Sequence, residues 1–335
     1  MTTIRDVAKL AGVSPATVSR VLNNKGYVSE EKLKIIDKVI KEMNFQPNQV
    51  ARGLTKKSSK TLALLVTDIT NPFFSELAKG AEKITQQLGY SLLLGNTGGN
   101  NPEKNADYMN FLKNKYIDGF IIATHDIDVE VLKKNYKSPM VILEADKDIE
   151  NLCTIKVDNY HGAIEATKHL LSIGCQKIAH IYGPQYDATA KDRLRGFKTS
   201  MKHQEGSSGI EYPGDFSIMS GIESIQELLK KHSDIDGIFA GNDLIAIGVV
   251  KELNRLKIKI PEQIAVCGFD GITLTQITSP EITTIEQPIY KMGELAAERL
   301  IYRINHSFNE TESIELKAKL VIRESTVKSA IDSKQ

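Results

Sequence analysis

Residues with catalytic or metal-binding side chains are scattered along this chain rather than grouped. Its seven histidines and three cysteines show no HExxH, no CxxC and no other spacing at which proteins hold metal ions. No serine stands in a GxSxG turn, so no nucleophile is paired with a base. We therefore expect no catalytic residue, no metal site, no cofactor and no enzymatic activity.

Residues suited to contact a polyanion occur near the N-terminus. Residues 4–11 carry apolar side chains at helical spacing, and Gly12 favours a tight turn after them. Ser14 is suited to cap a second helix and Pro15 to occupy its first turn, where a missing N–H is no loss. Residues 29–43 predict a third helix. Two short helices joined by a glycine turn are typical of a helix-turn-helix, although a plain helical hairpin has the same pattern. The apolar stripe expected on the third helix consists of Leu33, Ile36, Val39, Ile40 and Met43.

Charge is segregated along the sequence. The first 60 residues hold 12 Lys and Arg against 5 Asp and Glu, a net charge of +7, and the remaining 275 carry −6. A basic head on an acidic body predicts that a polyanion meets the head only. No apolar run has the length of a signal-peptide core or a membrane span, so we expect a cytoplasmic protein without membrane contact.

From Thr61 onward, apolar runs alternate with amphipathic helical stretches. Such runs are typical of parallel β-sheets covered by helices on both faces. They occupy residues 61–68, 91–96, 119–124, 139–144, 154–158, 177–183, 237–242 and 264–270. An internal repeat, in which DGFIIA at 118–123 recurs as DGIFA at 236–240, indicates two similar α/β halves. Two lobes with a cleft between them suit a hinged ligand clamp or a two-lobed enzyme.

Ligands collect at the carboxyl ends of parallel strands. Here those ends are Asp68, Thr124, Glu144, Asn242 and Asp270.

The N-terminal segment IRDVAKLAGVSPATVSRVLNNKGYVSEE, followed by NFQPNQVARGL, resembles the headpiece of the lactose/galactose repressor family of bacterial transcription regulators. Over residues 61 to 325 the body resembles the effector-binding core of these repressors and the periplasmic ribose- and galactose-type sugar-binding proteins. The matching segments are DITNPFF, AKDRLRGF, GDF, GNDLIAIG, GFDG and TTIEQP.

The resemblance implies an α/β protein with a three-helix helix-turn-helix headpiece and a hinge helix, followed by a two-lobed core of parallel sheets. The headpiece would span 1–46 and the hinge helix and linker 47–60. The N-terminal lobe would comprise 61–158 plus about 286–318, and the C-terminal lobe 159–285 plus about 319–335.

The resemblance also implies which residues meet double-stranded DNA. The positions that read bases match Pro15, Ala16 and Arg20, of which only Arg20 can bond guanine in a bidentate fashion. In the hinge segment 47–54, Leu54 would wedge into the central base step. Gly53 stands where serine is common, and a helical glycine weakens that helix. The other positions expected at the DNA are Ser14, Thr17, Ser19, Asn23, Ala51 and Lys56.

The residues implied at the effector are Phe73, Phe74, Thr124, Glu144, Arg193, Phe216, Asn242, Asp270 and Gln287. Aromatic rings would lie against the apolar face of a sugar, and Arg193, Asn242 and Asp270 would bond its hydroxyls. From the residues alone other roles stay open, because aromatic pairs often belong to cores and an aspartate in a turn often caps itself.

The constellation looks most like a ribose pocket, but Glu144-Ala145 stands where the ribose pattern has Asp-Arg. A hexose, fructose or sucrose therefore stays open as the effector, whereas Asp187, found where purine-responsive members carry Arg, argues against a nucleobase. The implied function is a repressor of a sugar-utilisation operon, released from a palindromic operator by its sugar, with corepression as the alternative. The tail after Arg323 has no leucine heptad, which favours a homodimer over a tetramer. Nothing in the sequence indicates a phosphocarrier protein as corepressor.

Overall fold

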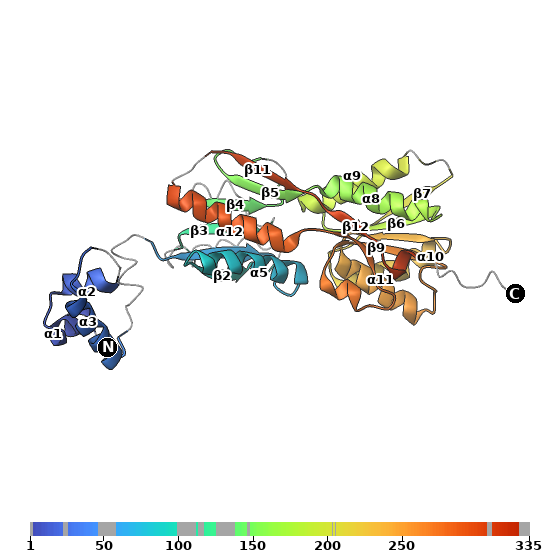
Figure 1. Ribbon diagram of the computed structural model, residues 1–335. Coiled ribbons are helices and arrows are strands. Elements are labelled where there is room, and N and C mark those ends of the chain that lie inside the picture. Colours follow the sequence, from blue (N-terminus) through green and yellow to red (C-terminus); the bar gives the residue numbers. More distant parts are fainter. Residues whose placement is uncertain are drawn as a thin grey trace. The chain divides into compact units, whose positions relative to one another are not determined.

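The computed structural model describes residues 3–22, 26–45, 58–98, 112, 117–124, 138–145, 148–202, 204, 206–306 and 310–327. The chain divides after Lys60 into two compact units, a headpiece and a body (Figure 1).

The headpiece contains the predicted helices α1 (Ile4–Leu10), α2 (Pro15–Leu22) and α3 (Glu30–Glu42). A reciprocal capping box begins α1, because the Thr3 hydroxyl accepts from the Asp6 amide and the Asp6 carboxylate accepts from the Thr3 amide. As predicted, the Ser14 hydroxyl accepts from the Thr17 amide at 3.1 Å and caps α2.

A small apolar core joins the three helices. Its buried members are Val7, Ala8, Ala11, Val18, Ile36 and Phe45. The prediction that Leu33 belongs to this core is wrong, since 41% of its surface is exposed. Phe45, just after α3, is a buried member of this core.

The body is built on two six-stranded sheets, as the two similar halves of the sequence indicated. The first has the strand order β11-β5-β4-β3-β1-β2 and the second β12-β10-β9-β8-β6-β7. All neighbours are parallel except β10 and β12. The repeated segments form β3 and β8, which occupy the same place in the two orders.

The eight predicted strands are all present. They are β1 (Thr61–Val66), β2 (Ser91–Asn96), β3 (Gly119–Ala123), β4 (Met140–Leu143), β5 (Cys153–Val157), β6 (Lys177–Tyr182), β8 (Gly237–Ala240) and β9 (Ala265–Asp270). Four strands were not predicted, because they are short or alternate between apolar and polar residues. They are β7 (Ser208–Pro213), β10 (Thr283–Glu286), β11 (Glu312–Leu316) and β12 (Lys319–Val321).

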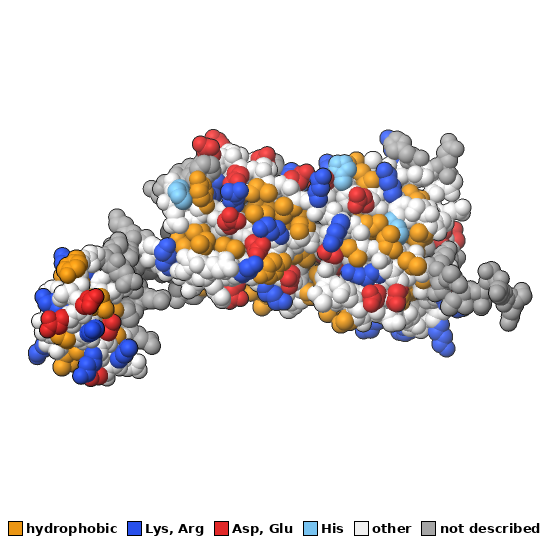
Figure 2. Space-filling model, in the orientation of Figure 1, with side chains coloured by type: hydrophobic (Ala, Val, Ile, Leu, Met, Phe, Trp, Pro, Cys, Tyr) orange, Lys and Arg blue, Asp and Glu red, His pale blue; other side chains and the backbone are white. Residues whose placement is uncertain are grey.

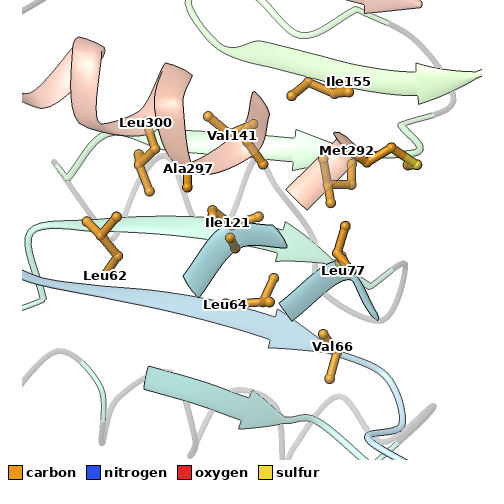
Figure 3. Close-up of a cluster of buried hydrophobic side chains, with 14 of the residues drawn as sticks. Leu62, Leu64, Val66, Leu77, Ile121, Val141, Ile155, Met292, Ala297 and Leu300 are labelled. Carbon is orange, nitrogen blue, oxygen red and sulfur yellow. The ribbon is translucent and has the colours of Figure 1, made fainter. Parts of the chain in front are cut away.

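Helices cover these sheets. The described helices of the body are α5 (Pro72–Gln87), α8 (Asn159–Ser172), α9 (Ala188–Lys202), α10 (Ile218–Lys231), α11 (Asp243–Arg255) and α12 (Ile289–His306). In the first lobe, side chains from β1, β3, β4 and β5 meet those of α5 and α12 in one core (Figure 3). Met292, Ala297 and Leu300 of α12 are fully buried there. Within the described ranges, no helix is long and apolar enough to cross a bilayer.

The chain passes between the two lobes three times. The connections join β5 to α8, β10 to α12 and β11 to β12. Each lobe is therefore assembled from segments that are distant in sequence, and the space between the lobes is bordered by strand ends of both sheets.

Candidate functional site

A cavity of about 540 Å³ lies between the two lobes. Its walls include residues at or just after the ends of β1, β4 and β9, namely Asp68, Glu144 and Asp270. This is the position that the sequence predicted for a ligand in parallel sheets.

Eight of the nine residues expected at an effector line this cavity. They are Phe73, Phe74, Glu144, Arg193, Phe216, Asn242, Asp270 and Gln287. Thr124 is buried and does not line the cavity, whereas its neighbour Ala123 does, so the contact of Thr124 with an effector stays a prediction. Ile121 and Ala123 of β3 face one core while Phe120 and Ile122 face the other. Because side chains alternate along a strand, Thr124 points to the same face of the sheet as Phe120 and Ile122.

Aromatic rings enter the cavity from both lobes. Asn71 caps α5 by accepting from the Phe73 amide at 3.0 Å, and the Phe73 and Phe74 rings pack edge to face with centroids 5.2 Å apart. Phe216, in the second lobe, has a φ of 68°. A Cβ at residue 183 would lie 2.1 Å from its ring, so only glycine leaves space for Phe216.

A buried ion pair forms the polar wall of the second lobe. Arg193 is 4% exposed, and its Nη2 lies 3.2 Å from Asp270 Oδ1. The same oxygen accepts from Gln287 Nε2 at 2.8 Å. Burial raises the pKa of Asp270 to about 6, although the charge of Arg193 acts in the opposite direction. Gln287 Oε1 is buried and has no hydrogen-bond partner among the described residues.

Local backbone geometry aims the acidic groups. Asp270 has a φ of 120° and Glu144 a φ of 54°, conformations that are rare for residues other than glycine and that cluster at functional sites. Asp243 fixes the turn after Asp270, because its Oδ2 accepts from the amides of Gly271 and Ile272 at 2.7 and 2.8 Å.

Glu144 is turned toward the first connection between the lobes. Its carboxylate accepts from the Val157 amide at 2.9 Å and from Asn159 Nδ2 at 2.8 Å. Burial raises the pKa of Glu144 to about 8, against the effect of these hydrogen bonds and of Arg193. If Glu144 contacts an effector, as expected, its carboxyl group does so while it also accepts from these two protein donors.

Asn242 likewise has protein partners. Its Oδ1 caps α11 by accepting from the Ile245 amide at 2.9 Å, and its Nδ2 donates to the Phe216 carbonyl at 3.2 Å.

Acidic side chains dominate the charge of the cavity. Among the described residues, the acidic lining residues are Asp68, Glu144, Asp187, Asp215 and Asp270, and the lining cation is Arg193. Asp68 lies at a predicted strand end and Asp215 in the matching segment GDF, but neither they nor Tyr186 carry a sequence signal for ligand contact. No described group of His, Cys, Asp and Glu residues has the arrangement of a metal site.

On the headpiece, α2 presents one side to solvent. Ser14, Pro15, Ala16 and Arg20 are exposed, and Thr17 and Ser19 are partly buried. Four residues expected at DNA lie outside the described residues: Asn23, Ala51, Leu54 and Lys56. The hinge segment 47–54 lies outside them as well.

Two protein-family models match the chain. Residues 3–48 match the bacterial regulatory proteins of the lacI family. Residues 59–324 match the periplasmic binding proteins and sugar binding domain of the LacI family.

Individual proteins match nearly the whole chain. The ribose operon repressor of Halalkalibacterium halodurans is 44% identical over 326 residues, which cover 97% of each chain. The lac repressor dimer bound to operator and the anti-inducer ONPF superposes with a TM-score of 0.88 at 25% identity, covering 98% of this chain and 99% of that one. A LacI family transcriptional regulator from Enterococcus faecium with bound ribose gives a TM-score of 0.73 at 32% identity, covering 79% of this chain and 98% of that one.

A helix-turn-helix unit joined to a two-lobed core with a polar, aromatic cavity defines a DNA-binding regulator that responds to a small molecule. The chain belongs to the lacI family of bacterial regulatory proteins. It is a sugar-sensing transcriptional repressor and not an enzyme, as the sequence predicted.

Proposed function

We propose that this protein represses a sugar-utilisation operon and is released from its operator when a ribose-like pentose binds between the lobes. The observation that carries the proposal is the cavity itself, which combines aromatic faces with buried hydrogen-bonding groups. The C–H faces of a sugar would lie against Phe73, Phe74 and Phe216, while its hydroxyls would meet Arg193 and Asp270.

One orphaned group supports this chemistry in particular. Gln287 Oε1 is buried without a hydrogen-bond partner among the described residues, and buried acceptors are rarely left so. A sugar hydroxyl would donate to it, whereas an apolar ligand would leave it unsatisfied.

The acidic lining favours an uncharged sugar over its phosphate ester. Among the described residues, the lining holds one arginine and five acidic side chains, of which Glu144 is largely neutral at pH 7 because burial raises its pKa to about 8. Arg193 already pairs with Asp270. A phosphate dianion would enter a field of its own sign without a second cation to neutralise it. The effector would then be the sugar before its phosphorylation.

The relatives add support for ribose. The repressor of H. halodurans is named for the ribose operon, and the E. faecium regulator was solved with ribose. The alternative of a hexose, fructose or sucrose rests on Glu144-Ala145 and on the cavity volume of about 540 Å³.

On DNA, we propose a cytoplasmic homodimer whose two helix-turn-helix units occupy successive major grooves of a near-palindromic operator. Arg20 would supply the base contact of greatest specificity, with Pro15 and Ala16 beside it. Residues 47–54 would pair as hinge helices in the minor groove, and closure of the lobes on sugar would separate them.

The test is operator affinity with and without sugar. A palindromic site is first selected from a random duplex library, and its affinity is then measured by fluorescence anisotropy with D-ribose, D-fructose, sucrose or ribose 5-phosphate. We expect D-ribose to weaken binding about 5- to 150-fold, the usual range of allosteric coupling, and ribose 5-phosphate to have no effect. Tighter binding would identify a corepressor instead, and an effect of fructose or sucrose alone would reject ribose as the effector.

A further inference from the structure

One buried side chain lies behind the cavity wall and contacts residues of both lobes of the body. Asn159 is the first residue of α8, directly after the first connection between the lobes, and only 3% of its surface is exposed. It does not line the cavity. Sequence reasoning missed it, since it lies one residue beyond the predicted strand end.

The amide of Asn159 joins two charged groups that do line the cavity. Its Nδ2 donates to Glu144 Oε2 at 2.8 Å and to the Val157 carbonyl at 3.0 Å. Its Oδ1 accepts from Arg193 Nε at 2.9 Å. Glu144 follows β4 of the first lobe and Arg193 belongs to α9 of the second, so this contact bridges the lobes.

The bridge requires an amide. An ionised aspartate in its place could donate neither to Glu144 Oε2 nor to the Val157 carbonyl, and an apolar side chain would leave Arg193 Nε buried without an acceptor. Arg193 has its other two nitrogens engaged, since Nη1 donates to the Gly241 carbonyl at 2.7 Å and Nη2 pairs with Asp270. The bond to Asn159 therefore completes the set that fixes the plane of the guanidinium.

We propose that Asn159 is a positioning residue that holds Arg193 and Glu144, one from each lobe, in the arrangement that the ligand meets. The proposal deepens the sugar-binding function proposed above and rests on it for the ligand. The contacts of Asn159 with Glu144 and Arg193 are made within the protein, so they can be tested separately from ligand binding.

The experiment exchanges the amide and the carboxylate between the two positions. The measurements are made at pH 9, because burial raises the pKa of Glu144 to about 8. There Asn159→Asp places two carboxylates face to face, whereas Glu144→Gln together with Asn159→Asp restores a donor opposite an acceptor and keeps an acceptor for Arg193. Asn254→Asp is the matched control, because Asn254 of α11 donates one hydrogen bond, to the Ser279 carbonyl at 2.8 Å, and lies outside the cavity lining. All variants are made in the full-length protein.

Two readouts are compared, D-ribose affinity by calorimetry and the unfolding equilibrium in urea without sugar. We expect Asn159→Asp to weaken ribose binding at least about tenfold and the double variant to recover most of that loss, with Asn254→Asp unchanged. In the urea experiment, the folding equilibrium constant of the double variant should be at least about threefold larger than the value obtained by multiplying the effects of the two single substitutions.

Purely additive losses, or a double variant that binds as weakly as Asn159→Asp or does not fold, would overturn the proposal. If the wild-type protein binds no D-ribose, the proposed effector is what fails. The unfolding cycle then still decides the inference, because a missing coupling between positions 144 and 159 contradicts it.

Discussion

Arg193 contacts several residues in and behind the cavity wall. It contacts Asn159, Gly241 and Asp270 through three different nitrogens, and its Cζ lies 3.8 Å from the centroid of the Phe269 ring. Removing one partner of a buried ion pair is far more destabilising than the pair is stabilising, since the other charge is left without compensation. The pair thus fixes geometry more than it adds stability.

Replacing the planar guanidinium of Arg193 by the ammonium group of lysine should show how much its set of hydrogen bonds contributes to ligand affinity. Arg193→Lys keeps the charge but loses the planar set of donors, and each lost charged hydrogen bond costs about 1.5–3 kcal/mol. We expect ribose affinity, measured by calorimetry, to fall at least about tenfold. Arg195→Lys, two residues further along α9, changes an exposed pair with Asp192 and should leave affinity within about twofold. Equal effects of the two changes would deny Arg193 a special role.

His180 should make the second lobe sensitive to acid. Its ring is fully buried, stacks on Phe239 with centroids 4.4 Å apart, and has Nδ1 2.8 Å from the Phe239 carbonyl oxygen. Burial lowers the pKa of His180 to about 3, whereas an unfolded histidine titrates near 6.5. The unfolded state therefore binds one more proton between these values, so stability is fully present above about pH 6.5 and is lost as pH falls toward 3.

The measurement is the free energy of unfolding in urea at several pH values from 7 to 4. The contribution of this one site approaches at most about 1.4 kcal/mol per pH unit. His180→Gln keeps a hydrogen-bond donor and removes the titration, so its profile should be flatter than that of the wild type. Parallel profiles would mean that other groups cause the acid sensitivity.

At the scale of elements, the first lobe depends on close contact between α5 and α12. A Cβ on Gly293 would lie 2.1 Å from the Leu77 carbonyl oxygen, and one on Gly80 would lie 2.0 Å from that of Tyr290. Each glycine thus lets the backbone of the other helix approach, and the two helices together cover one face of the first sheet (Figure 3).

Gly293→Ala should force these helices apart despite the higher helix propensity of alanine. Overpacking of this kind costs about 1–3 kcal/mol, which we expect as a lower melting temperature by calorimetry. Glu298→Ala places an alanine on the exposed side of the same helix and serves as the control. A Gly293→Ala protein as stable as the wild type would show that α5 and α12 can separate without loss.

Elements of the body follow from the sequence more completely than the site does. The strands β1 and β3 could be predicted because their sequences are continuously apolar, as expected of strands buried on both faces. The strand β11, with its alternating sequence ESIEL, is defined instead by its pairing with β5, which is distant in sequence. The side-chain directions of Asn159 and Thr124 could not be predicted for a different reason. Thr124 lies at a strand end and Asn159 at a helix start, and an error of one residue in such a boundary reverses the predicted direction of the side chain.

For the whole molecule, the segregation of charge divides the work between headpiece and body. Basic and acidic side chains intermingle on the visible face of both lobes (Figure 2), while the first 60 residues carry +7. The body should therefore add little attraction to DNA.

Operator binding should depend steeply on salt. If a dimer neutralises about 6–10 phosphates, affinity should fall about 10³- to 10⁵-fold between 50 and 200 mM salt. Anisotropy titrations at several salt concentrations give the slope. Lys79→Ala, on the body, should leave that slope unchanged, and a shallow slope for the wild type would indicate far fewer phosphate contacts.

The three passages of the chain between the lobes also bear on the order in which the protein is made. The helix α12 and the strand β11, which complete the first lobe, are synthesised only after most of the second lobe. Until then the apolar face that receives Met292, Ala297 and Leu300 stays uncovered on the nascent chain. The headpiece is a separate unit at the start of the chain, so a ribosome that stalls before α12 would release a DNA-binding head on an incomplete, aggregation-prone sensor.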